Sequence, residues 1–450
     1  MRMHRLFHTL PLAFVLFAGG VPVSTAPAGR QAAAAAPAAT LSDGIVLTRP
    51  ESVGFSSESL KELDAAMQGI VDNKHLAGVV TLVARHGRVV QHKAYGVQDL
   101  AGQTPMQLDT IMRIYSMTKP IAGAAMMMLY DEGKWKPSDP VAKHIPEFAD
   151  LKVFAGVDAD GKPMLVAPAH APTMGELMSH NAGFTYGLFG NSPVDKMYQA
   201  DNPLDAPSLQ AFIGKVAKMP LLYQPGEKWV YSVSVDIQGY LVQKLSGKTF
   251  PDFLRDRIFL PLGMKDTGFL VPESKLSRVS TIYTWDQAAK ALKGAPHDPG
   301  ISTMPGLPSG GGGLYSTAAD YFQFAQMIAN GGQLNGQRLL NASTVEMMRT
   351  NVLNEQTLNS KSGIGPVHLQ PGLGFGYDFA VMSDPVALKS PLGKGSFWWW
   401  GIAGTWFWID PANDVVFIGM IQRRGGAPGA ANHEDVARAA VYKALVDPAK

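Results

Sequence analysis

The chain has 450 residues, of which 46% are hydrophobic and 17% charged, so it can bury a sizeable core in one large domain or two interleaved lobes. Its formal net charge is only +2 and it has no Lys/Arg-rich run, which argues against nucleic acid as a partner. It has no cysteine, which excludes disulfides, thiolate metal sites and a cysteine nucleophile.

Residues 1–28 are predicted to be a signal peptide. A positively charged start precedes an apolar run, residues 10–18, that is too short to cross a bilayer, and Ala26-Pro27-Ala28 fits a small-x-small cleavage site. We therefore expect a periplasmic or secreted protein with no stable membrane anchor after cleavage; a retained anchor is the alternative. The Ala/Pro-rich residues 29–43 should form a flexible leader.

The first regular elements follow the leader. An amphipathic pattern predicts a helix around residues 59–71. The segment AGVVTLVARHGRVVQHKAYG then reads as two strands that join at His86-Gly87, which predicts a β-hairpin.

The stretch RIYSMTKPIAG opens an apolar, helix-like run. On a helix, positions three apart share a face, so Ser116 and Lys119 would point the same way from the first turn. Apolar surroundings disfavour the ammonium form of a lysine, and a serine beside a neutral lysine is an activated nucleophile. Alone, this tetrapeptide is better explained by a serine that caps a helix and a lysine that extends to solvent.

The chain ends on a second predicted hairpin and a helix. In GTWFWIDPANDVVFIGMIQ, two apolar and aromatic runs flank the turn at residues 410–414, and a helix is expected from about His433 to Leu445. Between the hairpins lie mostly helical patterns and Gly/Pro-rich loops. The pattern favours an α+β fold: an antiparallel sheet from both chain ends, flanked by helices, with an inserted helical lobe.

Three segments together resemble a known superfamily. Tyr231 lies in PGEKWVYSVSVDIQGYLVQKLSG, and GKGSFWWWGIAGTWFWIDP precedes the last hairpin. With SMTK, they are similar in order and wide spacing to the Ser-x-x-Lys, Tyr-x-Asn and Lys-Thr-Gly motifs of the serine β-lactamase and penicillin-binding superfamily. The likeness covers most of the mature chain and is strongest to the class C branch and the family VIII carboxylesterases, whose third motif is often Trp-x-Gly.

The resemblance implies a β-lactamase/transpeptidase-like catalytic domain over residues 44–450. Its α/β lobe would comprise about 44–145 and 305–450, and its helical lobe about 146–304. It also implies a serine hydrolase with neither cofactor nor metal.

The resemblance also implies roles for individual residues. Ser116 would be acylated, and Lys119 and Tyr231 would share the proton transfers, with the choice of base left open. The backbone N–H groups of Ser116 and Ile402 would form the oxyanion hole.

Two departures from the β-lactamase motifs bear on the substrate. Val233 stands where Tyr-x-Asn has asparagine, and Trp399 where Lys-Thr-Gly has lysine, so two polar anchors are replaced by apolar groups. We expect the substrate to contact Val233, Trp399 and the neighbouring Trp400-Gly401. Asn181, in the HNAG loop, is expected to brace the site; Ser179-His180-Asn181 also matches the Ser-x-Asn motif of other branches, but we interpret that loop as structural.

Other chemistries lack their sequence signatures. Gly310–Gly313 is not followed by the Lys-Ser/Thr of a phosphate loop, there is no Gly-x-Ser-x-Gly elbow, and no His-Glu-x-x-His spacing indicates zinc. The leading hypothesis is an exported esterase acting on small short-chain carboxylic esters. A β-lactamase or DD-peptidase-type amidase and a non-catalytic binding protein are the alternatives, and the oligomeric state is left open.

Overall fold

An eight-stranded antiparallel sheet organises the chain. The computed structural model describes residues 40–359, 365 and 369–447, so the predicted signal peptide and most of the predicted leader lie outside the described residues. The strand order in space is β12-β13-β14-β15-β16-β1-β2-β3. In that order the strands are Leu373–Phe375, Ala380–Met382, Phe397–Trp400, Trp406–Asp410, Val415–Met420, Gly78–Arg85, Arg88–Asp99 and Thr104–Pro105.

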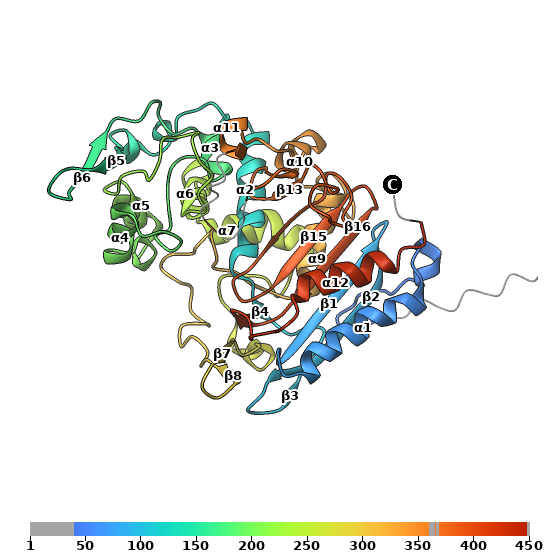
Figure 1. The fold of residues 1–450 in the computed structure, drawn as a ribbon. Helices are drawn as coiled ribbons and strands as arrows, with labels where there is room; N and C mark the ends of the chain where they lie inside the picture. The colour runs from blue at the N-terminus through green and yellow to red at the C-terminus, as the bar shows by residue number, and fades with distance from the viewer. Residues whose placement is uncertain (1–39, 360–364, 366–368, 448–450) are drawn as a thin grey trace, which may run out of the picture. The chain divides into compact units, whose positions relative to one another are not determined.

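The two ends of the chain meet at the centre of this sheet. Strand β1 pairs with β2 through the tight turn at His86-Gly87, and on its other side with β16, where Val83 lies opposite Phe417. Strands β15 and β16 form the second hairpin. Both predicted hairpins and the predicted α+β arrangement are therefore confirmed (Figure 1).

One face of the sheet is covered by helices α1 (Ser57–Asp72) and α12 (His433–Lys443), which pack against each other (Figure 1). Helix α1 starts after Ser56, whose side chain accepts a hydrogen bond from the Ser59 N–H. Its apolar residues recur every three or four positions, so one stripe of the helix is buried. These two helices stabilise the sheet on the face opposite to the one that carries the site.

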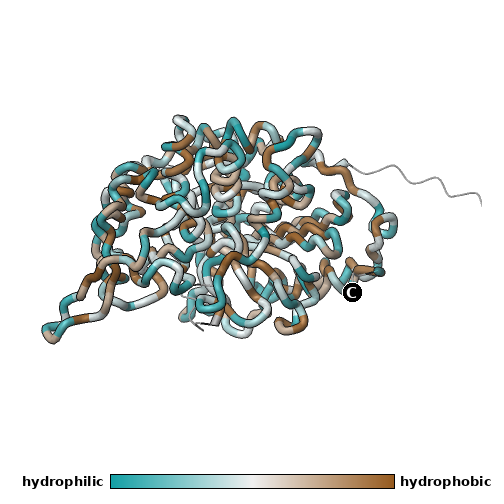
Figure 2. The backbone as a smooth tube through the Cα atoms, turned by 90° about the horizontal axis from the view of Figure 1, so that it is seen from above, coloured by the Kyte–Doolittle hydropathy of each residue, from teal (hydrophilic) through white to brown (hydrophobic). Residues whose placement is uncertain are grey.

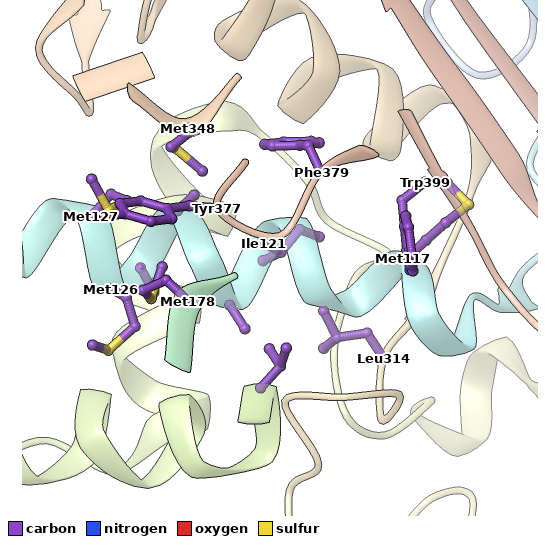
Figure 3. Close-up of a cluster of buried hydrophobic side chains, with 14 of the residues drawn as sticks. Met117, Ile121, Met126, Met127, Met178, Leu314, Met348, Tyr377, Phe379 and Trp399 are labelled. Atoms are coloured by element: carbon purple, nitrogen blue, oxygen red, sulfur yellow. The ribbon is translucent and has the colours of Figure 1, made fainter. Parts of the chain in front are cut away.

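The other face carries helices α2 (Thr118–Asp131) and α9 (Ala318–Ala329). Helix α2 is buried from Thr118 to Leu129 and runs through the main core (Figure 3). A helix that is apolar on all sides is stable only inside a protein, which explains the run Ala124–Leu129. The catalytic candidates Ser116 and Lys119 therefore stand at the start of the most deeply buried helix of this face.

The middle of the chain is mainly helical, as predicted. Helix α6 (Ser234–Ser246) packs against α2. The other α-helices of the described residues are α3 (Met174–Met178), α4 (Pro193–Ala200), α5 (Leu209–Val216), α7 (Phe250–Leu254), α8 (Leu260–Leu262), α10 (Ala342–Met348) and α11 (Glu355–Asn359). A hairpin of β5 (Val153–Val157) and β6 (Pro163–Val166) has a hydrophilic turn at its tip (Figure 2).

Short strand pairs outside the main sheet hold several loops in place. Strand β4 (Met112–Arg113) pairs with β9 (Tyr315–Ser316), just before the predicted nucleophile. A three-stranded sheet has the order β17-β7-β8, and another pair is β10-β11. Their bounds are Arg423–Arg424 for β17, Tyr283–Asp286 for β7, Ala291–Gly294 for β8, Gln333–Leu334 for β10 and Gln337–Arg338 for β11.

The structure corrects the end of the predicted leader. Asp43, assigned to the flexible residues 29–43, is buried and lies 3.0 Å from Nδ1 of His92 on β2. Thr40 forms a β-bridge with Val46, so the chain is held against the sheet from residue 40 onward. Within the residues that the structure describes, no helix has the length and apolar character needed to span a membrane.

Candidate active site

Ser116 and Lys119 lie together at the start of α2. Ser116 belongs to the short 3-10 turn Tyr115–Met117, which leads directly into the helix. The Lys119 ammonium donates to Ser116 Oγ at 3.3 Å. Lys119 is 1% exposed, so the alternative of a lysine that extends to solvent does not describe this position. The predicted pairing of serine and lysine is thus present in the geometry.

Three further groups surround the Lys119 Nζ atom. It donates to the Gly311 carbonyl at 2.6 Å, and it lies 4.5 Å from the ring centre of Tyr231 and 5.3 Å from that of Tyr186. A carbonyl oxygen and two aromatic faces attract a cation and restrict where the amine can point. The lysine is therefore held beside Ser116 by groups from three separate parts of the chain.

Tyr231 precedes α6 and is 5% exposed. Within the described residues its hydroxyl has no hydrogen-bond partner. A buried hydroxyl without a partner is uncommon and is available to a ligand or to an intermediate of a reaction. The ring of Tyr231 is surrounded by other aromatic rings at centroid distances of 5.0–6.1 Å, from His180, Tyr186, Phe189, Trp229 and Trp399.

His180, in the HNAG loop, supports the segment that carries Tyr231. Its Nδ1 accepts a hydrogen bond from the Ser232 N–H at 3.3 Å and lies 3.1 Å from Ser232 Oγ. Burial, assisted by the positive charge of Lys119, holds the pKa of His180 well below its ordinary value. The imidazole is therefore neutral at physiological pH and serves as an acceptor that orients the loop.

The four glycines at Gly310–Gly313 form the wall behind Lys119. The Gly311 N–H donates to the buried carboxylate of Asp236 at 3.0 Å, and Ser309 Oγ donates to the same oxygen at 2.5 Å. A Cβ atom at Gly311 would lie 2.4 Å from the Tyr186 hydroxyl and 2.5 Å from Asp236 Oδ2. Glycine is required here because the loop packs closely, and the packing sets the position of the carbonyl that Lys119 contacts.

The turn after β14 meets the turn that holds Ser116. Gly401 approaches so closely that a Cβ atom there would lie 2.3 Å from the Ile114 carbonyl oxygen, to which Thr405 also donates at 3.2 Å. Ile402 follows, 60% exposed, and its N–H has no acceptor within the described residues. The predicted oxyanion hole would use this N–H with that of Ser116, and the contact at Gly401 brings the two turns together.

Comparisons with known proteins place this geometry in a family. The model of the beta-lactamase family matches residues 63–442. The chain belongs to the beta-lactamase family. Protein Rv1367c of Mycobacterium tuberculosis (strain ATCC 25618 / H37Rv) is 34% identical over 366 residues, which cover 80% of this chain and 88% of that protein.

Two further relatives bear on the fold and the chemistry. Esterase EstB of Burkholderia gladioli is 29% identical over 381 residues, covering 81% of this chain and 90% of that protein. Among solved structures, that of EstCE1, a hydrolase with promiscuous acyltransferase activity, matches with a TM-score of 0.70 at 24% identity, over 86% of this chain and 99% of that one. The structural likeness confirms the β-lactamase-like fold, and the family and its esterase member support a serine hydrolase.

The predicted substrate contacts are mostly buried within this beta-lactamase fold. Val233 and Trp399 are each 1% exposed, because Val233 precedes the buried first turn of α6 and Trp399 points into the core beside Met117 (Figure 3). Asn181 is 5% exposed, and Trp400 is half-buried. Neither Val233 nor Trp399 lines an open surface. The Trp399 ring instead packs against the ring of Tyr231.

Sequence reasoning missed several residues of this site. Tyr186 and Phe189 contact Tyr231, and Asp236 and Gly311 hold the wall behind Lys119. Four glycines in a row are rare and are a signal in the sequence, but the sequence alone relates them only to a phosphate loop, which they do not match. Among the described residues, no group of three or more His, Asp or Glu side chains is placed to hold a metal ion.

Proposed function

We propose that this member of the beta-lactamase family is a serine carboxylesterase that forms an acyl-enzyme on Ser116. The observation that carries the proposal is the buried Lys119 amine, whose Nζ lies 3.3 Å from Ser116 Oγ and 4.5 Å from the centre of the Tyr231 ring. A nucleophile within reach of a positioned proton acceptor is the arrangement that covalent catalysis requires.

The steps follow from these positions. Ser116 Oγ attacks the ester carbonyl carbon while its proton passes to the Lys119–Tyr231 pair, and the Ser116 and Ile402 N–H groups stabilise the oxyanion. Collapse of this intermediate breaks the bond to the alcohol, which takes the proton from the same pair. Water then attacks the acyl carbon and transfers a proton to the pair; collapse breaks the bond to Ser116 Oγ, which takes that proton back, and the carboxylic acid leaves.

An ester is favoured over an amide by the groups around Ser116 and Tyr231. The positions of the family's polar anchors hold Val233, which has no polar side-chain atom, and Trp399, whose one polar atom is a buried indole nitrogen, so neither supplies the amide or the positive charge of those anchors. Two apolar side chains close to these groups are exposed: Ile402 is 60% exposed, and Phe189 is 43% exposed, with its ring 5.8 Å from that of Tyr231. Such surfaces bind apolar groups by burial, at about 25 cal/mol per Å².

The first experiment tests whether the chain is an enzyme. A fluorophosphonate probe should label the wild-type protein and not the Ser116→Ala variant. Lys119→Ala and Tyr231→Phe should each lower turnover of p-nitrophenyl butyrate by about 10³-fold or more, because such groups act as a unit. Tyr198→Phe is the matched control, since it removes another buried hydroxyl that has no partner among the described residues. A wild-type protein that is not labelled would favour the non-catalytic alternative.

A second experiment separates the esterase from the amidase alternative. We expect kcat/KM for p-nitrophenyl butyrate to exceed that for a chromogenic cephalosporin by orders of magnitude on the same preparation. The cephalosporin reaction need not be absent, since nucleophile and oxyanion hole would be shared. A preference for the cephalosporin or for a D-Ala-D-Ala peptide would refute the esterase assignment.

Export is part of the proposal and rests on residues 1–28. Cell fractionation should find the protein in the periplasm or medium, with a mature N-terminus near Gly29. A protein that stays in the cytoplasm with its first 28 residues intact would refute it.

A further inference from the structure

Two arginines close to the nucleophile turn have no carboxylate partner. The guanidinium carbons of Arg113 on β4 and Arg424 on β17 each lie 4.9 Å from the centre of the Tyr115 ring. In the part of the chain that the structure describes, neither guanidinium has a carboxylate oxygen within 4.0 Å. Two other partly buried arginines are paired, Arg85 with Asp447 at 2.6 Å and Arg278 with Asp266 at 2.8 Å, whereas the buried Arg423 donates to the backbone carbonyls of Gly425 and His75.

The hydrogen bonds of the two arginines are also incomplete. Arg113 Nε is buried and has no acceptor among the described residues, and Arg113 Nη1 lies 3.5 Å from the Tyr315 hydroxyl, at the limit of a hydrogen bond. Arg424 Nη2 donates to the Tyr115 hydroxyl at 2.6 Å. A guanidinium carries five donors, so most of the hydrogen-bonding capacity of this pair is unused. An unsatisfied buried donor requires an explanation.

A cavity of about 240 Å³ opens between these arginines. Its floor includes Tyr315 and Gln422, and the Gln422 side chain bonds both the N–H and the carbonyl of Arg113, which fixes the backbone of that residue. Asp298 also lines the cavity, so its wall carries two guanidinium groups and one carboxylate. The remaining charge is positive, and the volume suits a small molecule.

From these observations we infer that the cavity is a binding site for the carboxylate group of a small organic acid, held between Arg113 and Arg424. A planar carboxylate accepts paired hydrogen bonds from a guanidinium and would complete the donors left free here. The wall carboxylate of Asp298 disfavours a more highly charged anion such as phosphate.

The site adjoins the nucleophile through Tyr115. Tyr115 has a backbone φ of +42°, a conformation that is rare for a residue with a side chain, and Ser116 follows it directly. A ligand against the Tyr115 ring would therefore touch the turn that carries Ser116. Ester hydrolysis releases a carboxylic acid, which is a ligand of this class. Only this connection between the site and the reaction rests on the proposed function.

The test measures binding without requiring activity. The melting temperature of the full-length protein should rise with succinate concentration, relative to sodium chloride at the same ionic strength, because a ligand of the native state stabilises it. Arg424→Gln, at an exposed side chain, should reduce the apparent affinity at least tenfold, and Arg113→Gln should do the same. Arg88→Gln is the matched control, since this exposed arginine does not line the cavity.

One variant is expected to bind succinate more tightly. Such a gain in affinity cannot be explained by loss of folding, whereas the losses in the arginine variants could be. Asp298→Asn removes the repelling carboxylate, so the apparent affinity for succinate should increase severalfold. The inference is overturned if succinate has no effect beyond that of chloride, if both arginine variants respond like the wild-type protein, or if inorganic phosphate binds in an arginine-dependent manner while succinate does not.

Discussion

At the scale of single residues, Asp236 connects parts of the site that are far apart in the chain. Its carboxylate is fully buried and accepts hydrogen bonds from the Gly311 N–H, Ser309 Oγ and the Tyr186 hydroxyl. Gly311 in turn offers its carbonyl to Lys119. Asp236 therefore positions Lys119 through a single residue, Gly311, without touching it.

We expect Asp236→Ala to lower kcat for p-nitrophenyl butyrate at least tenfold, because small displacements of catalytic groups are costly. A positioning role predicts that the pH profile of kcat/KM changes as well, whereas a purely structural role would alter only the melting temperature. Asp320→Asn is the matched control: this buried carboxylate also accepts a backbone N–H, from Asp266 at 2.7 Å, and a hydroxyl, from Thr267 at 2.9 Å. Equal kinetic losses in both variants would contradict the positioning role.

A second buried acid, Asp378, bears on stability. Burial raises the pKa of its carboxyl well above the ordinary value, against the opposing effects of a hydrogen bond from Gln238 and the charge of Lys119. The folded protein thus keeps this proton to a higher pH than the unfolded chain does. Between the two pKa values the folded state binds more protons, so the free energy of unfolding falls as pH rises.

Asp378→Asn, which resembles the protonated acid, should therefore raise the melting temperature at pH 8, and its advantage should shrink toward pH 4. Asp150→Asn, at an exposed site, should change little across this range. Thermal unfolding at pH 4, 6 and 8 provides the comparison. A destabilised Asp378→Asn protein at pH 8 would mean that the ionised carboxylate is needed in the folded state.

At the scale of elements, the site depends on how two turns and a glycine wall pack around the start of α2. The spacing of Ser116 and Lys119 predicted their pairing because a helix alone brings them together. The Gly311 contact joins residues 192 positions apart, which no local pattern encodes. The sequence of β14 likewise does not show which of its tryptophans faces the core, since both faces of this strand are apolar.

The glycine wall can be tested by adding one methyl group. Gly311→Ala would place Cβ within 2.5 Å of the Tyr186 hydroxyl and of Asp236 Oδ2, so the loop must shift and Lys119 must lose its carbonyl contact. We expect a loss of about 10²-fold in kcat. Gly214→Ala is the control, because a Cβ there meets no atom within 4 Å on helix α5; it should leave kcat unchanged and stabilise the helix by up to about 1 kcal/mol.

At the scale of the whole molecule, the sheet is assembled from both ends of the chain. The sequence predicted this because each hairpin has an apolar pattern and a turn of its own, which are local signals. The short strands β12 and β13 have only three residues each; β12 pairs with β13 and β13 pairs with β14, so neither could be predicted locally. Because β1 pairs with β16, folding depends on contacts between residues more than 300 positions apart.

The N-terminal boundary of this assembly provides a final prediction. Burial by itself would raise the pKa of the Asp43 carboxyl, but the hydrogen bond and charge of His92 lower it below its ordinary value. This contribution to stability is present above the unfolded pKa and is lost as pH falls. A chain that begins at Thr40 should therefore keep the activity and melting temperature of the longer protein, whereas one that begins at Leu47 should melt at lower temperature. Asp43→Ala should reproduce part of that loss at pH 7 and less of it near pH 3; equal melting temperatures for the two shortened chains would show that residues 40–46 contribute nothing.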